Sequence, residues 1–138
     1  MVEQHTAQEQ DPGTLVVGLG KTGLSCVRHL RRLGRRVTAV DSRSSPPALA
    51  AVCDEFPEVR VTLGGFPRHA FENIGAIVVS PGVSLSEPAL KNALATRIPV
   101  CGDIELFARA VGATPVVAIT GSNGKSTVTT MVADMLRV

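Results

Sequence analysis

The fold is decided near the start of the chain by Thr14-Leu-Val-Val-Gly-Leu-Gly-Lys-Thr-Gly23. Residues 14–18 predict a buried strand that ends in a glycine turn, and residues 22–33 predict a helix that Gly34 stops. The join between them has the pattern G-x-G-x-x-G. Its glycines permit a tight turn (Gly18), close approach of a phosphate to the backbone (Gly20) and packing of the helix on the strand (Gly23). Because the free N–H groups at a helix start favour an anion, this loop predicts phosphate binding.

Strands and helices alternate along most of the remaining sequence. Further strands are predicted at residues 37–41, 59–63, 76–80 and 98–101, with helical segments between them. Such alternation calls for parallel strand pairing and right-handed crossovers. Aromatic residues make up only 3% of the chain, so Val, Leu, Ile and Ala must fill the core, as suits a parallel sheet buried on both faces. We therefore predict an α/β fold, a Rossmann-like open parallel sheet with flanking helices, over residues 14–102, after a disordered lead-in at residues 1–13.

Two other predicted strand ends carry residues suited to ligand binding. Asp41 ends the second strand, where Rossmann domains place a carboxylate on a ribose hydroxyl, and Arg43 is suited to a phosphate or a base. Ser80-Pro81-Gly82 ends the fourth strand, where a ligand could approach the backbone closely, although a plain strand-ending turn explains it equally well. Carboxyl ends of parallel strands share one edge of a sheet, so these residues and the first loop together predict a nucleotide site.

A second glycine-rich loop follows in Ala118-Ile-Thr-Gly-Ser-Asn-Gly-Lys-Ser-Thr127. Residues 116–120 predict a sixth buried strand, and a helix is predicted from residue 126 to the end. The tail Gly124-Lys125-Ser126 is that of a P-loop, in which backbone N–H groups cradle phosphates, the lysine neutralises their charge and the serine hydroxyl helps to hold Mg²⁺. The loop is shorter than the standard pattern because Ile119 stands in the place of its first glycine.

The second loop also bears on domain organisation. One strand, one loop and one helix cannot close a nucleotide-binding domain. We therefore expect residues 103–138 to be the start of a second, P-loop domain that is truncated in this sequence.

Composition and charge exclude several other classes of protein. The formal net charge is only +2, and the arginines of residues 28–36 have no aromatic residues among them for base stacking, so they predict a solvated helix face. The three cysteines and three histidines show no metal-ligand spacing. The first 13 residues lack the pattern of a signal peptide, and the apolar stretches are too short to span a bilayer. We expect a cytoplasmic protein without a nucleic-acid or membrane partner.

The combined motifs resemble the Mur ligases. Thr120-Gly-Ser-Asn-Gly-Lys-Ser-Thr-Val-Thr-Thr130 is similar to the ATP loop of that family. Four further motifs are similar to those of the family member that adds D-glutamate. They are Gly18-Leu-Gly-Lys-Thr-Gly-Leu-Ser25, Asp41-Ser-Arg43, Ser80-Pro-Gly82 and Gly102-Asp-Ile-Glu-Leu-Phe107. The resemblance runs from Leu15 to Val138 and implies that the P-loop domain begun by residues 103–138 is a central ATP-binding domain. It implies a step of peptidoglycan synthesis in which ATP, with Mg²⁺, phosphorylates the carboxylate of UDP-N-acetylmuramoyl-L-alanine, and the amine of D-glutamate attacks the acyl phosphate.

Matched residue by residue, the resemblance implies two binding sites. The diphosphate of the UDP substrate would meet the first loop, the uridine would lie at the ends of the second and fourth strands, and ATP with Mg²⁺ would lie on the second loop. The UDP-substrate residues would be Gly20, Lys21, Thr22, Gly23, Asp41, Ser42, Arg43, Ser80, Pro81 and Gly82. The ATP residues would be Gly121, Ser122, Asn123, Gly124, Lys125, Ser126 and Thr127, with Lys125 catalytic and Ser126 on the metal. The family's remaining metal and D-glutamate residues would lie beyond Val138, so we expect these 138 residues to be inactive alone, and monomeric.

Two alternatives stay open at this stage. An NAD(P)-binding oxidoreductase domain would explain the first loop and Asp41 but leaves the second loop unexplained. A non-catalytic nucleotide-binding module would explain both loops if the chain ended naturally at Val138. Titration with the UDP substrate, NAD(H) and Mg-ATP would separate the three.

Overall fold

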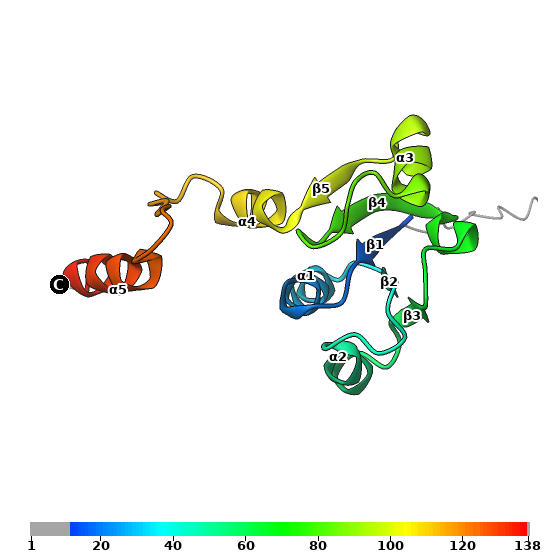
Figure 1. Cartoon of the computed structure of the whole chain (residues 1–138), viewed down its shortest axis with the longest axis horizontal. Coiled ribbons are helices and arrows are strands. Elements are labelled where there is room, and N and C mark those ends of the chain that lie inside the picture. The colour runs from blue at the N-terminus through cyan, green and yellow to red at the C-terminus, as the bar shows by residue number, and fades with distance from the viewer. Residues whose placement is uncertain (1–11, 138) are drawn as a thin grey trace, which may run out of the picture.

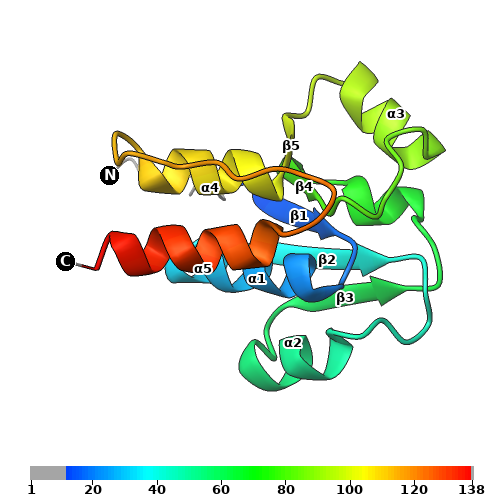
Figure 2. The same ribbon diagram turned by 60° about the vertical axis from the view of Figure 1, so that its left-hand side comes forward.

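The computed structural model describes residues 12–137 and contains one open sheet. Within this range, five parallel strands pair in the order β3-β2-β1-β4-β5. Figure 2 shows the arrowheads of β1, β2 and β3 pointing the same way. The Rossmann-like open parallel sheet expected from the sequence is thereby confirmed. The strands are β1 (Gly13–Val17), β2 (Val37–Asp41), β3 (Arg60–Leu63), β4 (Ile74–Val79) and β5 (Val100–Gly102).

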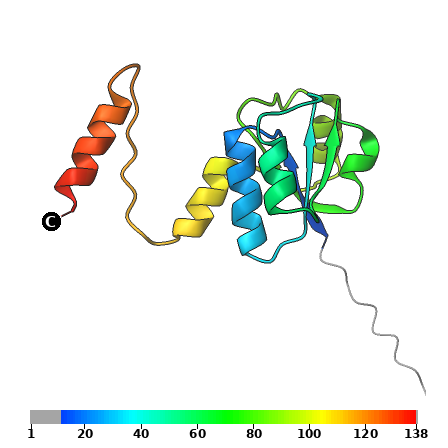
Figure 3. The ribbon, with the colours of Figure 1, turned by 90° about the horizontal axis from the view of Figure 1, so that it is seen from below.

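Helices cover both faces of this sheet. They are α1 (Lys21–Arg32), α2 (Leu49–Glu55), α3 (Pro88–Ala95) and α4 (Asp103–Val111), with a 3-10 turn η1 (Arg68–Phe71). A further helix, α5 (Lys125–Met135), does not cover the sheet. Figure 3 shows α1, α2 and α4 on one side of the strands and η1 with α3 on the other. Over residues 12–137, no helix is both long enough and apolar enough to cross a membrane.

The two faces of the sheet enclose separate apolar clusters because successive side chains of a strand point in opposite directions. On β1, Val16 packs with residues of α1 and α2, whereas Leu15 and Val17 pack with residues of α3. On β4, Val78 belongs to the first cluster and its neighbours in sequence to the second. Burial on both faces explains why these strands are continuous apolar runs rather than alternating ones.

The order of the strands reverses between β1 and β4. From β1 the chain moves outward to β2 and β3, and it then returns to the opposite side of β1 to form β4 and β5. The loop after β1 leads to α1 on one face, and the loop after β4 leads to α3 on the other face. Open α/β sheets bind ligands where two such loops diverge, at the carboxyl ends of the strands.

The prediction of a sixth strand at residues 116–120 is wrong. This segment forms no strand, and the side chains of Val116 and Val117 are more than half exposed. Its apolar composition suggested a buried strand, but a strand also needs a neighbour with which to exchange backbone hydrogen bonds, and no strand of residues 12–137 pairs with it. The helix expected after the second loop does form, as α5, and it stands apart from the sheet in Figure 1.

The predicted lead-in at residues 1–13 lies almost wholly outside the described residues. Its last residue, Gly13, is described and begins β1. A Cβ atom at Gly75 would clash with Pro12, so the described start of the chain runs close beside β4.

Candidate nucleotide-binding site

The first candidate site is the turn between β1 and α1. The N–H of Leu24 donates to the carbonyl of Gly20 at 3.1 Å, which is the first hydrogen bond of α1. The N–H groups of residues 21–23 precede that bond and therefore have no acceptor within the helix. A Cβ atom built on Gly20 would meet nothing within 4 Å, so a ligand has open access to the backbone here. The helix dipole adds to the attraction for an anion.

The turn requires glycine at two positions. Gly18 has φ = +94°, a conformation that L side chains rarely adopt. Gly23 lies under the turn, where a Cβ atom would be 1.9 Å from the carbonyl oxygen of Gly18. The roles assigned to these two glycines from the sequence, the tight turn and the helix-to-strand packing, agree with this geometry.

The peptide group between Gly18 and Leu19 is held at both ends by buried side chains of the neighbouring strand ends. On one side, Ser80, directly after β4, donates from Oγ to the carbonyl oxygen of Gly18 at 2.9 Å. On the other side, the N–H of Leu19 donates to Oδ2 of Asp41, at the end of β2, at 2.6 Å. One planar unit is thus fixed from two directions.

The backbone groups on either side of this peptide are also bound. The N–H of Gly18 donates to the carbonyl of Val40 at 2.8 Å, and the carbonyl of Leu19 accepts from the N–H of Ala48 at 3.2 Å. Every backbone donor and acceptor of residues 18 and 19 therefore has a protein partner. Leu19 is fully buried, so its side chain anchors the turn as well.

Asp41 is saturated with hydrogen bonds. Besides Leu19, its carboxylate accepts from the backbone N–H of Arg43 at 2.9 Å, from Nε of Arg43 at 2.8 Å and from Nη2 of Arg43 at 2.7 Å. Four donors fill the roughly four lone-pair positions of a carboxylate. Only 2% of Asp41 is exposed, whereas the side chain of Arg43 is half exposed at the same edge of the sheet.

The electrostatics of Asp41 follow from these contacts. The hydrogen bonds from the Arg43 side chain, aided by the two backbone N–H groups, lower the pKa of Asp41 to about 2 in spite of its burial. The carboxylate is therefore ionised at neutral pH, and it directs Arg43 along the sheet edge.

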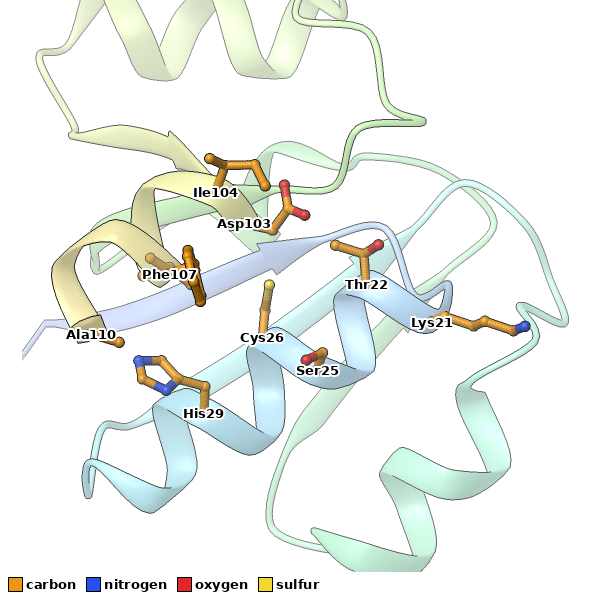
Figure 4. Close-up of a pocket in the computed structure, with 10 residues that line it drawn as sticks. Lys21, Thr22, Ser25, Cys26, His29, Asp103, Ile104, Phe107 and Ala110 are labelled. Atoms are coloured by element: carbon orange, nitrogen blue, oxygen red, sulfur yellow. The ribbon is translucent and has the colours of Figure 1, made fainter. Parts of the chain in front are cut away.

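A cavity of about 510 Å³ adjoins the first loop between α1 and α4. Figure 4 shows Thr22, Cys26 and His29 on the side of α1 that faces α4, while the side chain of Lys21 extends away from α4. From α4 the cavity is lined by Asp103, Ile104, Leu106, Phe107 and Ala110. The cysteine and histidine spacing gave no sign of this cavity, but Thr22, Cys26 and His29 are spaced so that they lie on one face of α1.

Within this cavity, Cys26 is not set up as a nucleophile. Burial, followed by the nearby Asp103 and Cys101, raises the pKa of its thiol to about 11. Among residues 12–137, no three His, Cys, Asp or Glu side chains gather in a way that could hold a metal ion.

The second loop is built differently from the first. Gly124 is the N-cap of α5, and the ammonium of Lys125 turns back over the loop to donate to the carbonyl of Gly121 and, at 3.5 Å, to that of Ser122. Ser126 and Thr127 lie in the first turn of α5, and both are exposed. Loop and helix have the expected order, although the strand that should precede them is absent.

The predicted residues fall into two groups. The structure brings together the first loop, Asp41 with Arg43, and Ser80, which come from three adjacent strands at one edge of the sheet. Ser42, Pro81 and Gly82 are exposed beside them. Residues 121–127 lie apart from this edge, beyond α4, in Figure 1.

The fold and the first loop together define a Rossmann-like α/β domain whose glycine-rich turn lies at the strand-order reversal. Residues 13–102 match the family model described as Mur ligase MurD-like, N-terminal domain. The chain belongs to this family.

Curated relatives agree with that assignment. The chain is 52% identical over 127 residues to the UDP-N-acetylmuramoylalanine–D-glutamate ligase of Marinobacter nauticus, covering 92% of this chain and 28% of the relative. It is 50% identical over 131 residues to the ligase of the same name from Methylobacillus flagellatus, covering 94% and 29%. The chain thus spans less than a third of the length of these relatives.

Two solved structures of ligases share the fold. The UDP-N-acetylmuramate-alanine ligase MurC of Thermotoga maritima aligns with a TM-score of 0.63 at 22% identity, over 91% of this chain and 29% of that one. A pseudomurein peptide ligase type C from Methanothermus fervidus aligns with a TM-score of 0.58 at 26% identity, over 91% and 26%.

Proposed function

We propose that this chain is the substrate-binding amino-terminal portion of an ATP-dependent ligase that joins D-glutamate to UDP-N-acetylmuramoyl-L-alanine. The proposal rests on membership of the MurD-like family and on relatives that carry that ligase name at about half identity. The observation that carries it is the first loop, whose free N–H groups at the start of α1 lie at the strand-order reversal.

The diphosphate of the UDP substrate would lie at the start of α1. The backbone at Gly20 is open to solvent, and the N–H groups of residues 21–23 have no acceptor inside the helix. The hydroxyl of Thr22 and the ammonium of Lys21 would add a further donor and a positive charge. A helix start binds a diphosphate through the same groups whether the ligand is a UDP-sugar or a dinucleotide, so the loop alone does not select the base.

The uridine would lie beside Arg43, Ser42 and the Ser80-Pro81-Gly82 turn. Arg43 is half exposed and held in place by Asp41, so its planar guanidinium presents one face or edge to a base or phosphate. The carboxylate of Asp41 has no free lone-pair position for a ribose hydroxyl, which weighs against the dinucleotide alternative. We propose that Asp41 serves the uridine through Arg43.

ATP would occupy the second loop. Its phosphates would take the place of the carbonyls that Lys125 now contacts, so that the ammonium of Lys125 neutralises phosphate charge. The residues present suit Mg²⁺, because the exposed hydroxyl of Ser126 is a hard oxygen donor and Mg²⁺ completes its shell with phosphate oxygens and water. When bound, Mg²⁺ would neutralise charge that develops on the phosphates during formation of the acyl phosphate.

Calorimetric titration of the 138-residue chain tests the assignment of the first loop. We expect UDP-N-acetylmuramoyl-L-alanine and UDP to bind and NAD(H) not to bind. Binding of NAD(H) without binding of either UDP ligand would reject the proposal in favour of a dinucleotide domain. We also expect no ADP release by these residues alone, and turnover in a coupled assay would contradict that.

The Lys125→Ala variant tests the division of labour between the two loops. In an enzyme of the full length of the relatives, this change should abolish binding of Mg-ATP and leave the affinity for the UDP substrate nearly unchanged. The matched control is Lys91→Ala, which removes the same charge from an exposed position of α3. Parallel loss of both affinities in Lys125→Ala would mean that the loops are wrongly assigned.

A further inference from the structure

We infer that Ser80 and Asp41 are positioning residues that fix the Gly18–Leu19 peptide and thereby aim the phosphate-binding amides of the first loop, rather than contacting the ligand themselves. The inference rests on the proposed function only for the identity of the ligand. The two side chains that hold this peptide come from the ends of β2 and β4, and the peptide itself follows β1, which lies between them.

The geometry leaves the peptide one orientation. In a trans peptide the C=O and N–H groups point in opposite directions, so rotating the unit breaks the bonds to Ser80 and Asp41 together. Rotation would also leave the buried N–H of Leu19 and the buried hydroxyl of Ser80 without a partner, at a cost greater than that of either hydrogen bond. A glycine at φ = +94° would otherwise allow the turn more than one conformation.

The constraint passes to the next residue. Because the carbonyl of Leu19 accepts from Ala48, the following peptide plane is fixed as well, and its other end is the N–H of Gly20. That N–H therefore points away from Ala48, and the N–H groups of residues 21–23 follow it directly along the chain. Fixing a binding loop before the ligand arrives raises affinity because less conformational freedom is lost on binding.

A direct role in ligand contact fits these two side chains poorly. The hydroxyl of Ser80 has a single proton, and it is used on the carbonyl of Gly18. The carboxylate of Asp41 has its acceptor positions filled, and both residues are buried. Ser80 therefore has no second proton to donate to a phosphate oxygen, and Asp41 has no acceptor position to spare, unless the loop is first released.

The test combines UDP affinity with amide hydrogen exchange in the 138-residue chain. Ser80→Ala removes only the hydroxyl, and we expect UDP affinity to fall about fivefold, the effect of one lost hydrogen bond. In the ligand-free chain we expect exchange of the Leu19 amide to accelerate by a similar factor, while the Val16 amide in the centre of β1 keeps its rate. Asp41→Asn, a second variant of nearly the same shape, should accelerate the same amide.

Ser84→Ala is the matched control, because it removes a hydroxyl from the same β4–α3 loop, and that hydroxyl accepts from the N–H of Ser86 at 3.1 Å rather than holding the first loop. It should change neither measurement. Lower UDP affinity in Ser80→Ala with unchanged Leu19 exchange would mean that the hydroxyl touches the ligand, and would overturn the inference. An unchanged affinity of Ser80→Ala for UDP would overturn the inference too. Binding of UDP by the parent chain would in that case still support the proposed function.

The same measurements could also reject the proposed function while supporting the positioning role of Ser80. If the parent chain bound NAD(H) in place of UDP, and Ser80→Ala weakened that binding with faster Leu19 exchange, the proposed function would fail and the positioning role would stand. Should the parent chain bind neither ligand, both would fall.

Discussion

Gly23 lies directly beneath the carbonyl of Gly18, so closely that a Cβ atom at position 23 would be 1.9 Å from the Gly18 oxygen. The obstacle is backbone rather than a flexible side chain, so it cannot move without opening the turn. The same loop contains Gly20, at which a Cβ atom would meet nothing within 4 Å. Two glycines of one motif therefore serve different purposes, one for packing and one for access.

The first prediction compares alanine at these two positions. Gly23→Ala should lower the free energy of unfolding by at least about 1–3 kcal/mol, because the added methyl group forces α1 and the turn apart. Gly20→Ala should cost about 1 kcal/mol or less, since alanine is only a poorer N-cap, yet it should weaken UDP binding by covering the backbone. Urea denaturation and UDP titration of both variants give the comparison. Equal stabilities would contradict the packing role of Gly23.

The second prediction concerns acid stability. The pKa of Asp41 is about 2 in the folded chain against 3.8 ordinarily, so its ionised form is favoured by folding. Its contribution, at most about 2 kcal/mol, should be fully present above pH 4 and disappear as the pH falls from about 4 to about 2. The difference in unfolding free energy between the parent chain and Asp41→Asn should shrink across that window. A difference independent of pH would show that the charge of Asp41 is not stabilising.

The third prediction concerns the helix that covers the second face of the sheet. Leu90 of α3 is fully buried in the cluster with Leu15 and Ile77, whereas Leu94, one turn later, is 47% exposed. Leu90→Ala should lower the free energy of unfolding by about 2–5 kcal/mol. Leu94→Ala should change it by less than about 1 kcal/mol. Circular dichroism is the suitable probe, because the chain has no Trp or Tyr.

A fourth prediction concerns thiol reactivity. Cys53 is exposed, while Cys26 is buried and its thiol has a pKa of about 11. Because the thiolate is the reactive form, iodoacetamide at pH 8 should label Cys53 first and reach Cys26 only after unfolding. Mass spectrometry of the peptides at successive times measures both rates. Comparable labelling of the two in the folded chain would mean that the α1–α4 cavity is open to the reagent.

Although β3 (Arg60–Leu63) alternates polar and apolar residues, much of the sheet was predictable because most of its strands are short apolar runs closed by glycine, proline or a charged residue. Residues 116–120 look the same, and there the prediction failed. An apolar composition indicates that a segment tends to be buried. Whether the segment forms a strand depends on another strand lying beside it, and therefore on the rest of the fold.

For the candidate site, the sequence placed Asp41 and Ser80 at strand ends, where the structure has them, but it did not show the relationship between them. Asp41 and Ser80 were both expected near the ligand, each as a contact. Their hold on one peptide group depends on β2 and β4 flanking β1, and alternation of strands and helices does not determine that order. The cavity between α1 and α4 was missed for a similar reason, since its two walls are distant in sequence.

The exposed stretch of residues 112–120 has a practical consequence. Extended, solvent-exposed backbone is where proteases cut most readily, whereas the sheet and its helices are protected by packing. Brief digestion should therefore divide the molecule between α4 and α5. Each glycine-rich loop would then remain on its own fragment, so that ligand binding by one could be tested without the other.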